Sequence, residues 1–192
     1  MKEIWLISGI PASGKTTISK KLAERLNKSV YISADDLRSQ ITTQVFPYVN
    51  TQEEVKEQSE MIIRKQCNLA KSNLEKGITP ICDEVVGKEE LSLYKNCLEG
   101  YNILLVTLNP AFHIVVERDN GRSEEQKFDT ESNPLPYPKK WWEHLKQLIL
   151  TVSDNGLWVD NSIMTIKETV TYILQNKEEC IVMSKFDTEH SK

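Results

Sequence analysis

Gly9 to Thr16 combines residue types at the spacing of a phosphate-binding loop, or P-loop. Glycines stand at its first and sixth positions, and Lys15 and Thr16 follow directly. Because Gly9 and Gly14 lack a Cβ, the backbone can curl closely round a polyphosphate with its N–H groups pointing inward. Lys15 then brings a cation to the β- and γ-phosphates, and the Thr16 hydroxyl is a ligand for Mg²⁺. The segment therefore predicts binding of a nucleoside triphosphate with Mg²⁺.

The segments on either side of this loop favour the P-loop over a glycine-rich turn without a ligand. Glu3–Ser8 is a mostly apolar run of strand length. Ile18, Leu22 and Leu26 follow at four-residue spacing, which predicts one face of a helix. The N-terminus of that helix adds partial positive charge to the phosphate site. The predicted nucleotide-binding residues of this region are Gly9, Ala12, Ser13, Gly14, Lys15, Thr16 and Thr17.

Asp35 and Arg38 are candidates for the chemistry of phosphoryl transfer. They follow Val30–Ile32, a second short apolar run of strand length, and are three residues apart at the start of a predicted helix. Ligands bind at the carboxyl ends of strands in open α/β sheets. A carboxylate that accepts a hydroxyl proton and a cation that stabilises the transferred charge fit transfer to an alcohol. The alternative is that Asp35 caps the helix, and we place Asp36 in its first turn, where the helix dipole favours a carboxylate.

Asp83 ends another short strand, Thr79–Asp83, in the pattern called Walker B. A carboxylate at this position binds Mg²⁺ directly or through water. The predicted metal ligands are therefore Thr16 and Asp83. Glu84 follows, and in nucleotide-hydrolysing ATPases a glutamate there orients the attacking water, so an ATPase or nucleotide-driven switch is the alternative function.

Arg118 and Arg122 lie four residues apart at the end of a predicted helix, and therefore on one face of it. Asn109 and Pro110 have the residue types of a helix N-cap and first position, with Phe112, Val115 and Val116 expected to face inward. The charged, proline-containing stretch that follows predicts a lid over about residues 118–138. The two arginines are expected to reach phosphate when the lid closes, unless they lie at a solvated helix end.

The remaining elements alternate in type along the chain. Thr51–Lys76 predicts a long helix ended by Gly77, and Thr165 with Glu168 has the spacing of a capping box before the last helix. The five predicted strands are Glu3–Ser8, Val30–Ile32, Thr79–Asp83, Tyr101–Leu108 and Gly156–Asp160. Strands alternating with helices predict a doubly wound α/β domain over residues 1–176, followed by a polar tail over residues 177–192.

Composition is that of an ordinary globular protein of 192 residues, with 39% hydrophobic and 27% charged residues. A net charge of −4 argues against tight, nonspecific binding to nucleic acid, which depends on Lys and Arg. We find no membrane-spanning run and no signal peptide, so we expect a cytoplasmic location. The cysteines form no C-x-x-C pair, which favours reduced thiols, and three separated histidines do not suggest a metal cluster.

The chain resembles P-loop kinases, and more narrowly the group of 5′-hydroxyl polynucleotide kinases, zeta toxins and chloramphenicol phosphotransferases. The resemblance covers about residues 1–175 and depends on four motifs. They are Gly9–Thr17, Ile32–Arg38, Glu117–Arg122 and the run from Val159 to Glu168. It implies a three-layer fold with a five-stranded parallel sheet in the order 2-3-1-4-5, helices on both faces and a small lid.

The same resemblance implies that Asp35 acts as the base, that Arg38 contacts the transferred phosphoryl group or the substrate, and that Arg118 and Arg122 bind phosphate. With Lys15, this makes a predicted catalytic set of Asp35, Lys15, Arg38 and Arg122, with Arg118 binding the nucleotide. The expected activity is transfer of the γ-phosphoryl group of Mg–ATP to a hydroxyl. The acceptor is expected to be a small molecule, with a nucleic-acid end as the other possibility.

Overall fold

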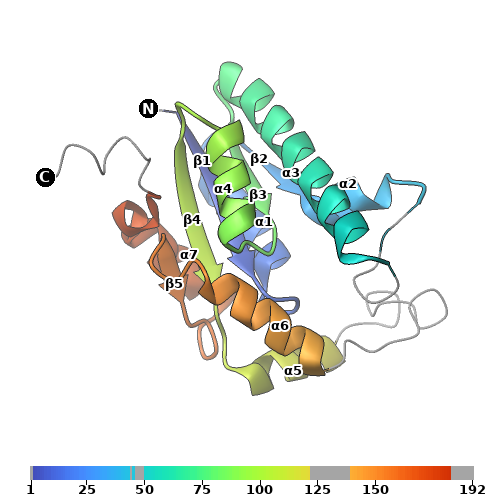
Figure 1. The fold of residues 1–192 in the computed structure, drawn as a ribbon. Helices are drawn as coiled ribbons and strands as arrows, with labels where there is room; N and C mark the ends of the chain where they lie inside the picture. The colour runs from blue at the N-terminus through green and yellow to red at the C-terminus, as the bar shows by residue number, and fades with distance from the viewer. Residues whose placement is uncertain (1, 44, 46–49, 122–138, 183–192) are drawn as a thin grey trace, which may run out of the picture.

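The computed structural model describes residues 2–43, 45, 50–121 and 139–182. At its centre is a parallel sheet of five strands in the order β2-β3-β1-β4-β5 (Figure 1). The strands are β1 (Glu3–Gly9), β2 (Ser29–Ser33), β3 (Thr79–Asp83), β4 (Asn102–Leu108) and β5 (Leu157–Val159). Each agrees with its predicted range to within one residue at either end, and the order is the one the resemblance implied.

Helices cover both faces of this sheet, which gives three layers. α3 and α4 pack on one face and α1 and α7 on the other. The helices are α1 (Lys15–Arg25), α2 (Ala34–Ser39), α3 (Gln52–Glu75), α4 (Lys88–Cys97), α5 (Phe112–Asn120), α6 (Lys139–Leu150) and α7 (Ile166–Gln175), followed by the 3₁₀ turn η1 (Lys177–Cys180). The chain thus has the fold of P-loop NTPases that includes the kinases. Among its described residues, no helix is both long and apolar enough to cross a membrane.

β1 shows why the central strands read as continuous apolar runs. Ile4 and Leu6 pack in the core under α3 and α4, whereas Trp5 and Ile7 pack in the core under α1 and α7. All four side chains are almost fully buried. Because helices cover both faces, both alternating sets must be apolar, and no polar face remains.

Local sequence sets the ends of α3 and the start of α7. Thr51 caps α3 and Thr165 caps α7, each through a reciprocal capping box with a glutamate at the third helical position. The prediction for Thr165 and Glu168 is confirmed. Gly77, directly after the C-cap of α3, has a φ of 72°, the left-handed conformation expected there.

The start and the buried face of α5 differ from the prediction. The helix begins at Phe112 with Ala111 as its N-cap residue, not at Pro110 after Asn109. No side chain caps the helix, and the Ala111 N–H donates to the hydroxyl of Ser162, a residue distant in sequence, at 2.8 Å. Only Val115 of the three apolar residues expected inside is fully buried, whereas Phe112 and Val116 are 38% and 39% exposed.

The packed part of the chain extends beyond residue 176, where we had expected a polar tail. η1 leads into a bridge between Ile181 and Leu104 of β4, and the Val182 N–H donates to Ile103 O at 2.9 Å. Cys180 and Val182 are buried in the cores on opposite faces of the sheet. Residues 177–182 therefore belong to the folded domain.

Candidate active site

The P-loop between β1 and α1 has the backbone conformation that its glycines predict. Gly9, Ala12 and Gly14 have φ values of 145°, 59° and 102°. A Cβ built on Gly9 would lie 2.6 Å from both Leu108 O and the Ser13 hydroxyl, so no side chain fits there. α1 begins directly afterwards at Lys15 and points its N-terminus at the loop, which favours an anion at this position.

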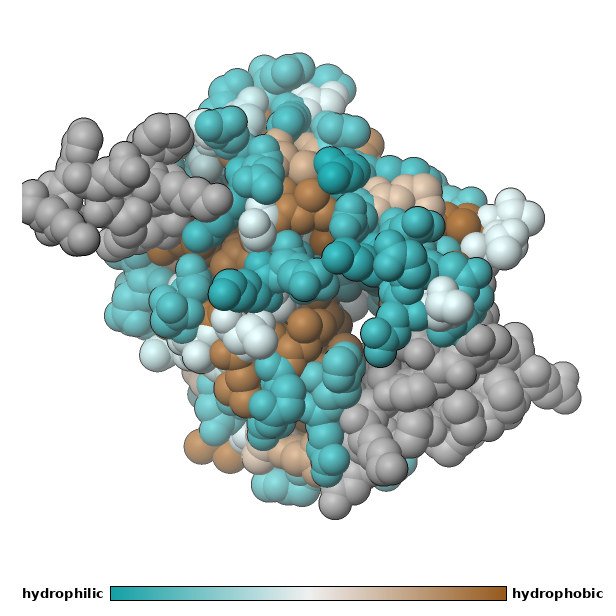
Figure 2. Space-filling model, in the orientation of Figure 1, coloured by the Kyte–Doolittle hydropathy of each residue, from teal (hydrophilic) through white to brown (hydrophobic). Residues whose placement is uncertain are grey.

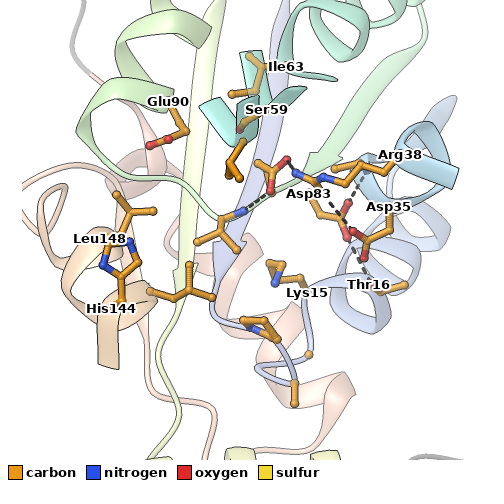
Figure 3. A pocket seen from close by; sticks show the side chains of 18 of the residues that line it. Lys15, Thr16, Asp35, Arg38, Ser59, Ile63, Asp83, Glu90, His144 and Leu148 are labelled. Atoms are coloured by element: carbon orange, nitrogen blue, oxygen red, sulfur yellow. Dashed lines mark hydrogen bonds and ion pairs between the residues drawn. The ribbon is translucent and has the colours of Figure 1, made fainter. Parts of the chain in front are cut away.

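Lys15 lies inside the curve of this loop (Figure 3). Its Nζ donates to Gly9 O at 2.8 Å and to Ile10 O at 3.3 Å. Burial lowers the pKa of Lys15, and nearby carboxylates, that of Asp83 first, oppose this shift. The loop thus holds a cation within the curve that its N–H groups line.

Asp83 and Thr16 come together as the Walker B prediction requires. The Thr16 hydroxyl donates to Asp83 Oδ2 at 3.3 Å, the Tyr31 hydroxyl to the same oxygen at 2.7 Å, and the Ala34 N–H to Oδ1 at 3.2 Å. Burial raises the pKa of Asp83, while the hydrogen bonds from Tyr31 and Ala34 and the charge of Lys15 lower it. A hard cation such as Mg²⁺ prefers carboxylate and hydroxyl oxygens, so this pair fits it beside a polyphosphate. No group of three or more His, Cys, Asp or Glu side chains placed to hold a metal ion occurs among the described residues.

Asp35 and Arg38 face each other on α2, as their spacing predicts. Arg38 Nη1 donates to Asp35 Oδ1 at 3.0 Å, and Arg38 Nη2 forms a close ion pair with Glu84 Oε2 (Figure 3). Asp35 is not the helix cap, because the Ser33 hydroxyl has that role and accepts from the Asp36 N–H at 3.1 Å. Asp36 lies in the first turn, as expected. The Asp35 side chain is 85% exposed and lines the cleft described below.

Glu84 does not lie where a water-orienting glutamate after the Walker B aspartate was expected. Its side chain is only 6% exposed. One carboxylate oxygen is paired with Arg38, and the other accepts from the Val85 N–H at 2.8 Å. Burial raises the pKa of Glu84, and the charge of Arg38 opposes this shift. The ion pair joins residues 46 positions apart, so local sequence spacing carried no signal for it.

Arg118 contacts the P-loop from the side of β5. Its guanidinium donates to Ser13 O at 3.1 Å and to Asn161 O at 2.8 Å. Asn161, which follows β5, donates to Ser13 O through its side-chain amide at 3.0 Å. Asn161 is buried, and sequence reasoning assigned it no role although it lies in one of the four motifs. Arg122 and residues 122–138 of the predicted lid lie outside the described residues, so their roles stay predictions.

Gln66 is a second residue that sequence reasoning missed. It lies fully buried in the apolar stripe of α3, and its amide donates to Ile32 O at 2.9 Å and to Asp83 O at 3.1 Å. Its carbonyl accepts from the buried Tyr94 hydroxyl in a short hydrogen bond. Gln66 therefore joins the ends of β2 and β3, from which the carboxylates of the site extend. A polar side chain within an otherwise apolar stripe was the available signal.

One cleft of about 1830 Å³ contains the P-loop and all of these charged groups. It has two arms. The β5 arm is lined by Arg118, Gly121, Asn161, Met164, Ile166 and Thr169. The helical arm is lined by the cleft residues of α2, α3, α4 and α6 together with Glu84 and Val85. Single small-molecule pockets typically occupy about 300–1,000 Å³, so the cleft has room for two ligands side by side.

The fold and this loop define a P-loop nucleotide-binding domain, and sequence comparison assigns it to a family. A family model described as "AAA domain" matches residues 4–148. This match covers most of the chain, which therefore belongs to that AAA domain family. No curated protein matches the chain with significant sequence similarity.

Solved structures with the same fold include kinases. A sugar kinase from Janibacter sp. HTCC2649 is similar with a TM-score of 0.63 at 12% identity, over 94% of this chain and 96% of that one. The shikimate kinase of Aquifex aeolicus has a TM-score of 0.56 at 16% identity, over 92% and 96%. A chain of the Pnkp1/Rnl/Hen1 RNA repair complex has a TM-score of 0.58 at 20% identity, over 80% of this chain and 46% of that one. The narrower resemblance to one kinase group stays a prediction.

Proposed function

We propose that the protein is a phosphotransferase that moves the γ-phosphoryl group of Mg–ATP to a hydroxyl of a second substrate. The observation that carries this proposal is the arrangement of one cleft. The P-loop and Lys15 lie at its centre, the Asp83–Thr16 pair lies beside them, and Asp35 with Arg38 lies on the wall of the helical arm. Nucleotide in the β5 arm and acceptor in the helical arm account for both arms of the cleft.

Each of these residues has a role in the proposed transfer. The acceptor oxygen forms a bond to the γ-phosphorus while the bond to the β–γ bridging oxygen breaks, which leaves ADP, and Asp35 takes the acceptor proton. Lys15 and Arg38 neutralise charge on the transferred group, since Arg38 keeps donors beyond those bound to its two carboxylates. Thr16 and Asp83 hold Mg²⁺, which when bound neutralises the phosphate oxygens.

The alternative, an ATPase in which Glu84 orients water, fits the site less well. Both carboxylate oxygens of Glu84 are already engaged, one by Arg38 and one by the Val85 N–H. A glutamate that positions water needs a free oxygen facing the γ-phosphate. The ATPase would hydrolyse ATP steadily without an acceptor, and Glu84→Gln would slow it whereas Asp35→Asn would not.

Substitution of Asp35 tests the proposal directly. With an acceptor found by screening hydroxyl compounds for ATP-dependent phosphate uptake, Asp35→Asn should lower kcat by roughly 10²–10⁴-fold while Mg–ADP binding stays close to that of the wild type. The matched control is Asp36→Asn, which removes the same charge from the next residue of α2. Equal loss of ADP binding and transfer in Asp35→Asn would contradict its role as the base. ATP binding without transfer to any acceptor would indicate a non-catalytic nucleotide-binding protein.

A further inference from the structure

The helical arm is acidic among the residues that the structure describes. It presents six carboxylates and three cations: Asp35, Glu53, Glu60, Glu84, Glu89 and Glu90 against Arg38, Lys56 and Lys88. A cleft lined mainly by one sign of charge concentrates ligands of the opposite sign. The net negative charge of the helical arm therefore affects which acceptors enter it.

Two of its three cations are already paired with carboxylates. Arg38 is held between Asp35 and Glu84, and Lys56 Nζ lies 3.3 Å from Glu89. Lys88 is exposed at the start of α4. The remaining donors of Arg38 are assigned to the transferred phosphoryl group in the proposed reaction, so a phosphate on the acceptor would have to compete with Glu89 for Lys56.

Apolar side chains form the rest of the wall. Ile63, Leu93 and Leu148 line the arm from α3, α4 and α6. In Figure 2, hydrophobic and hydrophilic residues lie side by side on this face of the molecule. Glu90 lies half-buried in this wall opposite Leu148 (Figure 3), and its Oε2 accepts from the Gly87 N–H at 3.0 Å. A partly desolvated carboxylate beside apolar surface suits a ligand that combines a hydrocarbon body with a cation.

From this charge distribution we infer that the acceptor is a small alcohol with an apolar body and a protonated amine, bound with the amine toward Glu90 and its hydroxyl toward Asp35. This inference rests on the proposed phosphotransferase function and specifies its substrate. It disfavours acceptors that carry phosphate, including a 5′-hydroxyl polynucleotide end. Attraction between the amine and the acidic arm weakens as salt screens the charges.

A set of acceptors matched in size tests the inference. Cyclohexylmethanols with an aminomethyl, methyl, carboxyl or phosphoryloxymethyl group opposite the hydroxymethyl group would be compared with aminocyclitols, inositol and a 5′-hydroxyl oligonucleotide, using γ-labelled ATP. The expected result is the highest kcat/KM for the amines, falling with added salt. A higher kcat/KM for neutral, carboxylated, phosphorylated or oligonucleotide acceptors overturns the inference and leaves the phosphotransferase standing. Transfer to none of these acceptors overturns both.

Two substitutions locate the effect, one at Glu90 in the first turn of α4 and one at Glu99, two residues after the end of α4. Glu90→Gln keeps an oxygen for the Gly87 N–H and removes the charge, so it should lower the ratio of amine to neutral-acceptor kcat/KM by about tenfold, mainly through KM. Glu99→Gln removes the same charge from an exposed position that does not line the cleft, and should leave that ratio unchanged. An unchanged ratio in Glu90→Gln, or an equal fall in both variants, contradicts the assignment to Glu90.

Discussion

Arg38 holds together carboxylates from two separate segments. Its neighbour Asp35 is on the same short helix, so a three-residue spacing was enough to predict their contact. Its other partner, Glu84, follows β3 directly. Only the pairing of β2 with β3 in the sheet brings the carboxyl ends of these two strands together. Local periodicity predicts contacts within one helix, whereas this ion pair depends on strand order. The same limit applies to Asn161, whose contact with Ser13 spans 148 positions.

Tyr31 is expected to fix the carboxylate of Asp83, the proposed Mg²⁺ ligand. Its hydroxyl donates to Asp83 Oδ2 at 2.7 Å, the same oxygen that accepts from Thr16. Tyr31→Phe keeps the ring and removes this donor, so the carboxylate becomes free to turn away from Thr16. Removal of such a supporting partner typically weakens metal binding by roughly 10-fold or more, and we expect this loss in the Mg²⁺ dependence of ADP binding.

The measurement is a titration of Mg²⁺ at fixed ADP, followed by calorimetry, together with binding of Mn²⁺ as a spectroscopic probe. ADP binding without metal should change little, because Tyr31 lies beside the carboxylate and not in the P-loop. Tyr172→Phe, on the partly exposed surface of α7, is the control. An Mg²⁺ requirement equal to that of the wild type in Tyr31→Phe would show that Asp83 needs no such support.

At the scale of elements, the sequence predicted most where the signal was local. Apolar runs located all five strands, and capping residues with Gly77 located both ends of α3 and the start of α7. The predicted start of α5 was wrong. The helix begins at Phe112, and the Ala111 N–H before it donates to Ser162, which is not a neighbour in sequence. Phe112 was expected inside, yet it packs edge-on against Trp142 of α6 at 6.2 Å and stays partly exposed. The resemblance, not the spacing, predicted the strand order.

The contact between α4 and α6 makes a prediction at this scale. A Cβ built on Gly87 would lie 2.5 Å from Leu148 Cδ1 and 2.7 Å from its Cγ, and the Lys88 N–H donates to the Thr151 hydroxyl at 2.9 Å. Gly87 has a φ of −104°, which alanine also adopts, so the clash and not backbone strain is at issue. Gly87→Ala should therefore destabilise the protein by about 1–3 kcal/mol through overpacking, measured by urea unfolding.

A double-mutant cycle with Leu148→Ala separates this clash from the weaker N-capping of alanine relative to glycine. If Leu148 is the obstacle, Gly87→Ala should cost about 1 kcal/mol less in the Leu148→Ala background, a coupling in the range measured for residues in contact. Strict additivity of the two substitutions would contradict a direct clash. It would place the cost of Gly87→Ala in the cap alone.

For the whole molecule, the cleft lies at the carboxyl edge of a sheet whose two faces are both filled with apolar side chains. The same strands that build these cores end in Ser33 and Asp83, next to the charged groups of the site. Those ends are polar although the strands behind them are apolar. The domain therefore has an apolar core on each face of the sheet and a polar site at the sheet edge, and the site contributes less to the stability of the fold than the cores do.

Asp83→Asn is expected to have opposite effects on the free protein and on the ligand-bound protein. Burial raises the pKa of Asp83 in the folded state above its ordinary value. The folded protein then binds a proton more tightly than the unfolded chain, so ionisation lowers stability as the pH rises from the ordinary pKa to the raised pKa, and the cost is complete above that. Asparagine removes this cost while its oxygen still accepts from Ala34. Free Asp83→Asn should therefore melt above the wild type at about pH 7, with the gain vanishing as the pH falls below the ordinary pKa of Asp.

With nucleotide and Mg²⁺ present, the wild type should melt above Asp83→Asn, the reverse of the order for the free proteins. A ligand present at 100 times its Kd stabilises the folded state by about 2.7 kcal/mol, and wild-type protein should gain this in Mg–ADP. Asp83→Asn should keep the part of the gain that ADP gives without metal and lose the part that Mg²⁺ adds, because asparagine brings no charge to the cation. Differential scanning fluorimetry at both pH values, with EDTA and with Mg²⁺, measures all of these shifts. A variant that is less stable than the wild type when free at neutral pH, or equally stabilised by Mg²⁺, would show that the buried carboxylate is retained for the fold and not for the metal.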